Sequence, residues 1–325
     1  MLQFNTSLKL VLADVDETIA DVYTKATPEM ISALNSFLAE GRALFLVSGG
    51  GLQSIRERVT DQLRPELRHK VLIAHCSGAE VWGFQKGGEI NSEPYYGVYE
   101  GHFTDDQKRT WREITNQLIE KYHLKTYTPQ PRKAFIEASL ADPLSIMLAD
   151  RGPQITFEFT NSINLTLEQK AQIEKVTGVE IPSTHDMYDL RYPVMEDAKA
   201  LYAQAGLPVH PHLGGIFALD HVIEGVDKTR AVKHVLHDTS ILASLDLQRE
   251  DINDVHEIEI WGDKFSQKKG GPDFQMCLAV SPQVRTIDFR DEEDLPKGYA
   301  IHVWDGTKHL HEGLLEYLTS HYSNK

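Results

Sequence analysis

The sequence contains little cysteine and no long apolar run. Its 325 residues include 2 cysteines, Cys76 and Cys277, which are too few for a disulfide framework and too far apart for a CxxC metal pair. No apolar stretch approaches the ~20 residues that cross a bilayer. The first residues, Met-Leu-Gln-Phe-Asn-Thr-Ser, lack the basic start and apolar stretch of a secretory signal. We therefore expect a reduced, cytoplasmic protein with no membrane partner.

The sequence also lacks an excess of basic residues and the common nucleotide-binding loops. It has 33 lysines and arginines against 48 aspartates and glutamates, a formal net charge of −15, which argues against a nucleic-acid partner. Neither GxxxxGKS/T nor GxGxxG occurs. Hydrophobic residues at 41% and charged residues at 25% are ordinary for a globular protein. The length predicts about two domains.

Apolar runs alternate with helix signals at both ends of the chain. Runs over residues 8–13, 43–47 and 71–74 predict buried strands, and helices are expected to begin at Thr27-Pro28 and near Leu52. Towards the C-terminus we expect a helix around 231–236, strands over 258–261 and 276–280, and a terminal helix over 310–318. This alternation indicates an α/β fold with a parallel sheet. The polar–apolar pattern of 256–260 weakens the case for a fully buried strand there.

The middle of the chain has a different pattern. Capping boxes open predicted helices at 104–107 and 166–169, and residues 155–159 alternate as in a half-buried strand. We therefore predict an inserted α+β domain over 88–212, within a core domain made of 1–87 and 213–325. Gly87-Gly88 and Gly214-Gly215 are candidate hinges near the two boundaries.

Two polar segments follow the first two predicted strands. The first, Asp14-Val-Asp16-Glu-Thr18, has carboxylates that suit Mg²⁺ or nucleophilic attack on phosphorus; the alternative is an acidic loop that caps a helix. The second, Ser48-Gly49-Gly50, is an anion site at a helix start or an ordinary glycine turn. Ligands of open α/β sheets bind beyond the carboxyl ends of the strands, where both segments are expected.

Two more polar segments lie in the last third of the chain. Gly225-Val-Asp-Lys228 opens a predicted helix, where a lysine opposes the helix dipole unless an anion is near; the alternative is a solvent-exposed lysine. Trp261-Gly-Asp263-Lys264, followed by Gly270-Gly-Pro-Asp273, supplies two further carboxylates or forms a capped surface loop. The acidic run 290–294 is expected to be a solvated loop.

The order of these four segments resembles the haloacid dehalogenase superfamily. Its pattern is Asp-x-Asp-x-Thr, then Ser or Thr, then Lys, then Gly-Asp followed by Asp. The resemblance covers about 1–85 and 213–325, and implies a Rossmann-like core with a parallel sheet plus an inserted α+β cap between the second and third segments. This is the arrangement of subfamily IIB, which includes Cof-type, phosphomannomutase-like and trehalose-phosphatase-like members. Within the family, the third and fourth segments, with Gly214-Gly215 and Asp220 before them, look most like eukaryotic-type phosphomannomutases. The segment 301–306, Ile-His-Val-Trp-Asp-Gly, looks more like the trehalose-phosphate phosphatases.

The resemblance also implies a role for each motif residue. It makes Asp14 the nucleophile, Asp16 the general acid and base, and Lys228 the cation that neutralises charge between Asp14 and the phosphate. Further residues would hold Mg²⁺ or the phosphoryl oxygens: Asp14, Asp16, Asp263 and Asp273 for the metal, and Thr18, Ser48 and Gly49 for the phosphate.

The sequence departs from the family pattern at several positions, and these departures bear on whether the protein is a phosphatase or a phosphomutase. Glu17 stands where sugar-phosphate members usually have glycine, and Cys76-Ser-Gly stands where Glu-Asn-Gly is common. Phe159-Thr-Asn-Ser lacks the arginine with which phosphomannomutases hold a second phosphate. We therefore expect a Mg²⁺-dependent phosphatase that hydrolyses a small phosphate ester, for example a sugar phosphate. The alternatives are a hexose phosphomutase and a non-catalytic sugar-phosphate-binding protein.

Overall fold

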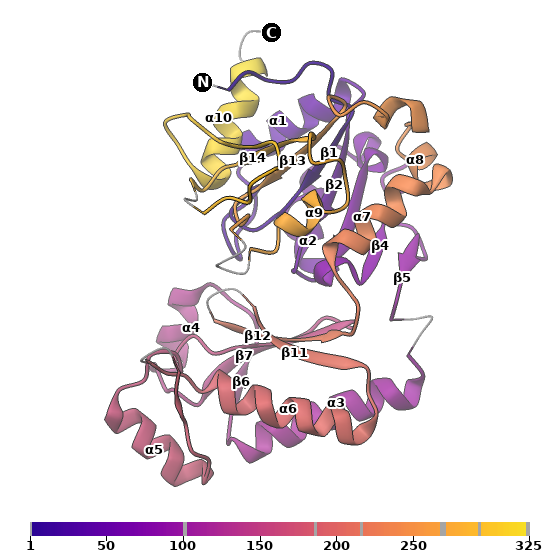
Figure 1. Ribbon diagram of the computed structural model, residues 1–325. Helices are drawn as coiled ribbons and strands as arrows, with labels where there is room; N and C mark the ends of the chain where they lie inside the picture. The colour runs from indigo at the N-terminus through magenta and orange to yellow at the C-terminus, as the bar shows by residue number, and fades with distance from the viewer. Residues whose placement is uncertain are drawn as a thin grey trace. The chain divides into compact units, whose positions relative to one another are not determined.

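The computed structural model describes residues 2–99, 103–184, 187–214, 217–266, 271–291 and 294–322. The chain divides into two compact units, Met1–Gly97 with Val226–Lys325, and Val98–Gly225. Each is described below by itself (Figure 1). Gly215 and Gly270, which belong to the sequence motifs, lie outside the described residues.

The first unit is built on an eight-stranded sheet. Its strands from β15 to β3 are parallel, and β4 and β5 pair antiparallel at one edge. The expected α/β fold with a parallel sheet is therefore confirmed. In spatial order the strands are β15 (Ile301–Val303), β14 (Arg285–Asp288), β13 (Ile258–Gly262), β1 (Leu10–Ala13), β2 (Ala43–Val47), β3 (Val71–His75), β4 (Glu80–Trp82) and β5 (Tyr96–Gly97).

Both faces of this sheet are covered by helices, because the central strands are apolar on both sides. In β1, Val11 packs in one buried cluster with α1 and α10, while Leu10 and Leu12 pack in another with α7 and α8. This is why β1, β2 and residues 71–74 of β3 form continuous apolar runs rather than alternating. The helices of the unit are α1 (Pro28–Ala39), α2 (Leu52–Arg58), α7 (Lys228–His237), α8 (Thr239–Ser244), α9 (Phe274–Cys277) and α10 (Leu310–Tyr322).

The second unit contains a five-stranded, mainly antiparallel sheet. Its order is β11 (Val209–Gly214), β12 (Ala218–Ile223), β8 (Gln154–Glu158), β7 (Ser145–Asp150) and β6 (Lys125–Tyr127), with β9 (Ser183–Thr184) and β10 (Met187–Tyr188) as a separate pair. The helices are α3 (Asp105–Lys121), α4 (Arg132–Ala138), α5 (Leu167–Thr177) and α6 (Arg191–Ala205). Both predicted capping boxes are formed, at the starts of α3 and α5.

The unit boundaries differ from the expected core of 1–87 and 213–325 and insertion of 88–212. Tyr96–Gly97 forms β5, which pairs with β4 and so belongs to the first unit. The second expected boundary falls inside β11, which pairs along its whole length with β12 and thereby joins the second unit. Strand pairing, rather than the position of glycines, decides where each unit begins.

Two further expectations about the first unit were wrong. Residues 276–280 are not a strand: Phe274–Cys277 is the short helix α9, and periodicity alone does not separate a short buried strand from a short buried helix. The strand at 258–262 is fully buried despite its polar–apolar pattern. Its Glu259 accepts hydrogen bonds from Arg285 Nε at 2.7 Å and Trp261 Nε1 at 2.9 Å, which compensate the buried charge.

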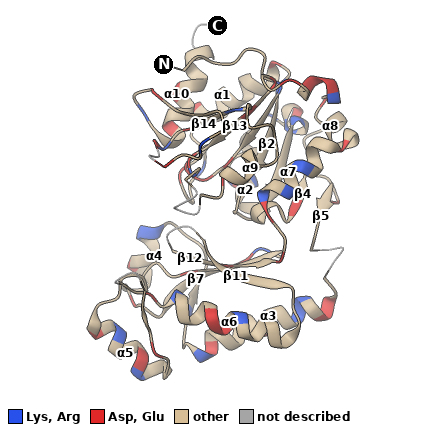
Figure 2. Cartoon of the chain, viewed as in Figure 1, with Lys and Arg blue, Asp and Glu red and all other residues tan. Residues whose placement is uncertain are grey.

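Acidic and basic residues alternate along the ribbons of α3, α5 and α6 (Figure 2). On α5, for example, Lys170 Nζ lies 2.6 Å from Glu174 Oε1 one turn later. Pairs of opposite charge one turn apart favour the helical conformation locally, and salt screens them. Among the described residues, no helix is both long enough and apolar enough to span a membrane.

Candidate functional site

The polar segments predicted to converge do meet at the carboxyl ends of adjacent parallel strands. Asp14 follows β1, Ser48 follows β2 and Asp263 follows β13, and β1 pairs with both neighbours in register. The backbone holds the first residues past the strands in place: Asp14 N–H donates to Trp261 O at 3.0 Å, and Ser48 N–H donates to Ala74 O at 2.9 Å. Sheet pairing therefore brings together residues far apart in the sequence.

Three buried carboxylates form the centre of the site. Asp14, Asp263 and Asp273 each offer an oxygen, and these atoms all lie within 4.8 Å of one another. Asp263 and Asp273 are fully buried and Asp14 is 5% exposed. Three anions so close together in a low-dielectric environment repel strongly unless cations are near.

Lys228 supplies one of those cations. It is the first residue of α7, is 1% exposed, and its Nζ lies 2.8 Å from Asp14 Oδ1 and 2.7 Å from Asp273 Oδ1. The two carboxylates explain why a lysine is tolerated at the positive end of a helix. The alternative of a solvent-exposed lysine is therefore wrong.

The pKa shifts follow from burial and charge. Burial and the neighbouring charge of Asp273 raise the pKa of Asp14 above its usual 3.8, although Lys228 opposes the shift. Burial and Asp273 likewise raise the pKa of Asp263. Burial disfavours the charge on Lys228, but Asp14 and Asp273 outweigh it and raise the pKa of the lysine. The site thus retains uncompensated negative charge that an added cation would stabilise.

Asp273 orients other groups of the site. Its Oδ2 accepts hydrogen bonds from the backbone N–H of Asp263 at 3.1 Å and of Lys264 at 3.0 Å, while its Oδ1 faces Lys228. A Cβ on Gly262 would lie 2.8 Å from Asp273 Oδ2 and 2.7 Å from the Phe265 ring. Glycine at 262 therefore permits the close approach that locks this loop.

Thr18 and Arg290 hold the Asp263 carboxylate from two sides. Thr18 Oγ1 donates to Asp263 Oδ1 at 3.1 Å, and Arg290 donates to Asp263 Oδ2 at 2.7 Å. Arg290 also pairs with Glu17, and Lys264 Nζ lies 3.4 Å from the same glutamate. The Thr18 hydroxyl donates its hydrogen bond to Asp263 in this structure. The predicted role of Thr18 as a phosphate ligand stays a prediction.

Ser48 lies in a turn braced by the segment after β3. Ser48 Oγ accepts from Gly50 N–H at 3.0 Å, Ser77 N–H donates to Ser48 O at 2.9 Å, and Cys76 N–H donates to Gly50 O at 2.9 Å. Cys76 and Ser77 take positive φ values of 50° and 59° to do so. The Cys-Ser-Gly departure from the family pattern therefore shapes the turn that carries Ser48 and Gly49.

Asp16 stands apart from the carboxylate cluster. Its Oδ1 lies 2.7 Å from Arg58 NH1, and its side chain is 27% exposed whereas that of Asp14 is 8% exposed. The roles of Asp16 in proton transfer and of Asp14 in nucleophilic attack stay predictions of the resemblance. The backbone contact of Asp16 with a metal stays a prediction.

Sequence reasoning missed the cations at the rim of the site. Arg290 was expected in a solvated loop, but it is partly buried and bonded to Asp263; residues 292–293 of that loop lie outside the described residues. Arg58 gave no signal, because a basic residue in the last turn of a helix is common and its partner Asp16 lies in a different segment. Lys264 belongs to the predicted segment Trp261-Gly-Asp263-Lys264. Its place next to Asp263 in the sequence was the signal that could have assigned it to the site.

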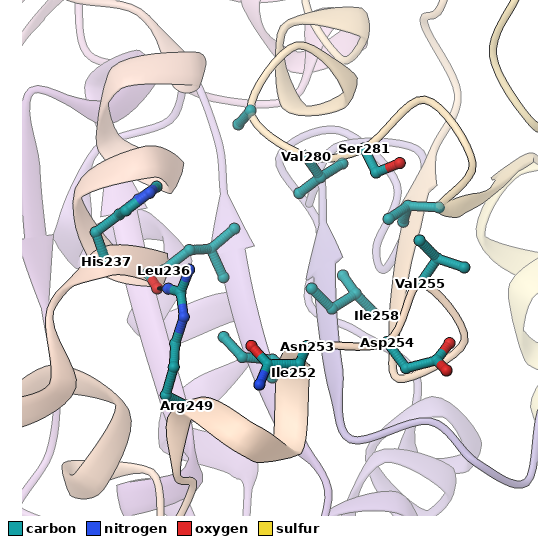
Figure 3. Close-up of a pocket in the computed structure, with 12 residues that line it drawn as sticks. Leu236, His237, Arg249, Ile252, Asn253, Asp254, Val255, Ile258, Val280 and Ser281 are labelled. Atoms are coloured by element: carbon teal, nitrogen blue, oxygen red, sulfur yellow. Dashed lines mark hydrogen bonds between the residues drawn. The ribbon is translucent and has the colours of Figure 1, made fainter.

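A cavity of about 180 Å³ lies elsewhere in the first unit (Figure 3). It is lined by Leu236, Ile258 and Val280 among others, at the amino end of β13. Ligands of an open parallel sheet bind beyond the carboxyl ends of its strands, and that is the end where the three carboxylates lie. The cavity contains none of the motif residues.

The fold is similar to that of solved haloacid dehalogenase-like structures. No family model and no curated protein matches the sequence. Solved structures match the fold. A trehalose-6-phosphate phosphatase related protein has a TM-score of 0.53 at 14% identity, covering 96% of each chain. A haloacid dehalogenase-like hydrolase from Bacteroides thetaiotaomicron has a TM-score of 0.55 at 15% identity, covering 96% of this chain and 99% of that chain.

A third structure is the C-terminal domain of a trehalose-6-phosphate phosphatase from C. albicans. It has a TM-score of 0.55 at 11% identity and covers 97% of this chain and 92% of that chain. These likenesses show that the chain has the haloacid dehalogenase fold over nearly its full length.

Proposed function

We propose that this protein is a Mg²⁺-dependent phosphatase that hydrolyses a small phosphate ester, for example a sugar phosphate, through an aspartyl-phosphate. The observation that carries the proposal is the contact between the Lys228 ammonium and the Asp14 carboxylate at the carboxyl ends of parallel strands. An ammonium there offsets the repulsion between a carboxylate nucleophile and a phosphate dianion. Solved structures of similar fold include a trehalose-6-phosphate phosphatase domain, which is consistent with this activity.

The chemistry divides between the two carboxylates of the first segment. An Asp14 oxygen attacks phosphorus, the bond from phosphorus to the ester oxygen breaks, and Asp16 gives its proton to the departing oxygen. Water then attacks the phosphorus of the aspartyl-phosphate and its proton passes to Asp16, which releases phosphate and restores Asp14. The Ser48 hydroxyl and the Gly49 N–H would hold phosphoryl oxygens.

The carboxylate cluster fits Mg²⁺. Hard carboxylate oxygens are its preferred protein ligands, and Asp14, Asp263 and Asp273 lie close enough to share one ion. Burial first, and the neighbouring carboxylates second, raise the pKa values of Asp14 and Asp263, and a bound cation would favour their ionised forms. When bound, the ion adds positive charge beside the phosphoryl oxygens.

Hydrolysis is favoured over phosphoryl transfer between two positions of a sugar. A mutase must hold two phosphates in turn, and the stretch 159–162 lacks the arginine that phosphomannomutases use. In this structure Asn161 Nδ2 instead donates to Ser139 Oγ at 2.9 Å and to Asp142 O at 3.2 Å. The Asn161 side chain therefore makes its hydrogen bonds within the second unit, which is the proposed cap.

The test is a panel of phosphate monoesters assayed for released phosphate with Mg²⁺. We expect turnover of at least one sugar or polyol phosphate, and none above background for Asp14→Asn. Asp106→Asn, on an exposed helix start paired with Arg109, is the matched control and should keep full activity. Full activity of Asp14→Asn would exclude this mechanism.

The same assays separate the alternatives. Conversion of a hexose 1-phosphate to the 6-phosphate without phosphate release would identify a mutase. Binding of sugar phosphates without any turnover across the panel would identify a binding protein.

A further inference from the structure

Arg58 is a buried arginine whose guanidinium is fully directed at the segment carrying Asp16. It is the last residue of α2 and is 7% exposed. Its NH1 lies 2.7 Å from Asp16 Oδ1, its Nε donates to Thr24 O at 2.7 Å, and its NH2 donates to Asp21 O at 2.9 Å. Because each of its three nitrogens has a partner, Arg58 is built into the fold rather than presented to a ligand.

The Asp16 segment is itself tightly folded. Glu17 N–H donates to Ala20 O at 2.7 Å, Ala20 N–H donates to Val15 O at 3.1 Å, and Glu17 takes a positive φ of 65°. This turn fixes the backbone of Asp16 but leaves its side-chain torsions free. The contact that restrains the carboxylate itself is the ion pair with Arg58.

Arg58 also connects two parts of the site. The backbone N–H of Ala26 donates to Arg58 O at 2.9 Å, so the far end of the same segment is tied to the same residue. Helix α2, which ends at Arg58, begins directly after the Ser48–Gly50 turn. One residue thus joins the carboxylate that would transfer protons to the helix beginning at the expected phosphate-binding turn.

We propose that Arg58 is a positioning residue that holds the Asp16 carboxyl group in the orientation needed for proton transfer to the leaving oxygen. This inference rests on the proposed function. Arg58 itself touches neither the ester nor the nucleophile. The planar guanidinium presents donors in fixed directions, so it can donate to one carboxylate and two backbone carbonyls at the same time. A lysine ammonium is a compact charge without these fixed directions and cannot replace all three contacts in the same geometry.

The test compares two esters that differ in how much they need a proton donor. Phenyl phosphate has a poor leaving group and depends on proton transfer, whereas para-nitrophenyl phosphate has a good one. General acid–base catalysis supplies ~10²–10⁴-fold, and we expect Arg58→Gln to lose roughly tenfold or more of this in kcat/KM for phenyl phosphate. For para-nitrophenyl phosphate the loss should be under about twofold, since little proton transfer is needed there.

Matched variants separate positioning from a general effect on the fold. Arg56→Gln removes a partly exposed arginine of the same helix, whose Nε lies 3.3 Å from Asp61 Oδ1, and should change neither ester. Arg58→Lys should fall between wild type and Arg58→Gln for phenyl phosphate. Thermal unfolding midpoints of all variants are compared, so that kinetics are measured only where the protein is folded.

A double-mutant cycle tests whether Arg58 acts through Asp16, and it does so independently of the ester used. On an Asp16→Asn background, Arg58→Gln or Arg58→Lys should cause no further loss, because the group they position is already gone. Equal losses with both esters, or an undiminished loss on the Asp16→Asn background, would overturn the inference while leaving the phosphatase proposal standing. If the wild type hydrolyses neither ester nor any other, the proposed function fails and this inference with it.

Discussion

Lys228 Nζ lies 2.8 Å from Asp14 Oδ1, although 214 positions separate the two residues in the chain. The lysine begins helix α7 and the aspartate directly follows strand β1, so two different motifs meet at one ion pair. Both side chains are nearly excluded from solvent. The contact ties the proposed nucleophile to the cation that would let it approach a phosphate.

Removal of Lys228 should destabilise the protein as well as inactivate it. Lys228→Met leaves Asp14 and Asp273 buried without their shared cation, and breaking a buried pair in this way costs about 3–5 kcal/mol. The measurement is the free energy of unfolding in urea without added metal. Lys233→Met, an exposed position on the same helix, is the control and should change it little. An equal effect of both variants would contradict the role of the ion pair.

Added Mg²⁺ should stabilise the protein more at high pH than at low pH. The raised pKa values of Asp14 and Asp263 mean that the metal-free fold holds protons which the unfolded chain has released. Stability of the metal-free protein therefore falls as pH rises above the usual carboxyl pKa of 3.8 towards the raised values. Mg²⁺ competes with those protons, so we expect a larger rise in the unfolding midpoint at pH ~8 than at pH ~5.

The size of the metal effect follows from mass action. At a Mg²⁺ concentration of ~100 times the dissociation constant, the stabilisation is about 2.7 kcal/mol. Thermal melts with Mg²⁺ and with EDTA measure it. Asp263→Asn should remove most of the difference in unfolding midpoint between the Mg²⁺ and EDTA samples, and Asp106→Asn should leave this difference unchanged. A shift that survives Asp263→Asn would place the ion elsewhere.

The second unit should lose stability in mild acid through His221. Burial lowers the pKa of His221 to about 3 from its usual 6.5, and its Nδ1 lies 2.6 Å from the Tyr202 hydroxyl. The unfolded chain therefore binds a proton that the fold excludes, so this contribution is complete above pH 6.5 and is lost as pH falls towards 3. At pH ~5 the expected loss is about 2 kcal/mol.

Hydrogen exchange of the β8 and β12 amides, corrected for the intrinsic rate, reports this loss. Protection should fall between pH ~7.5 and pH ~5 in the wild type, and the slope should flatten in His221→Gln. An unchanged slope in that variant would assign the acid sensitivity to another group.

Glu259 should matter for stability and not for the chemistry. Its carboxylate is fully buried and bonded to Arg285, Trp261 and Tyr317. Glu259→Ala leaves those donors without their acceptor, which costs about 3–5 kcal/mol, while kcat at a temperature where the variant is folded should be unchanged. Glu250→Ala, an exposed position, is the control. A fall in kcat of the folded variant would extend the site to this network.

Local sequence signals predicted the strongly patterned elements of both units. The continuous apolar runs of β1, β2 and β3 indicated strands buried on both faces, and they are. The capping boxes at Thr104 and Thr166 marked the starts of α3 and α5. Short apolar runs carried less information, which is why the helix α9 was expected to be a strand.

What the sequence determined by itself was which chemical groups follow the parallel strands, because strand ends and helix starts are set by local apolar runs, caps and glycines. This placed Asp14, Ser48 and Asp263 at one edge of a sheet before any coordinates were considered. Only the tertiary structure decided which side chains restrain those groups. Packing brings Arg58 to Asp16, and the pairing of β14 with β13, in which Asp288 lies opposite Gly262, brings Arg290 to Asp263. The unit boundaries were decided in the same way, by the pairing of β5 with β4 and of β11 with β12, because a strand belongs to the sheet that completes its hydrogen bonds.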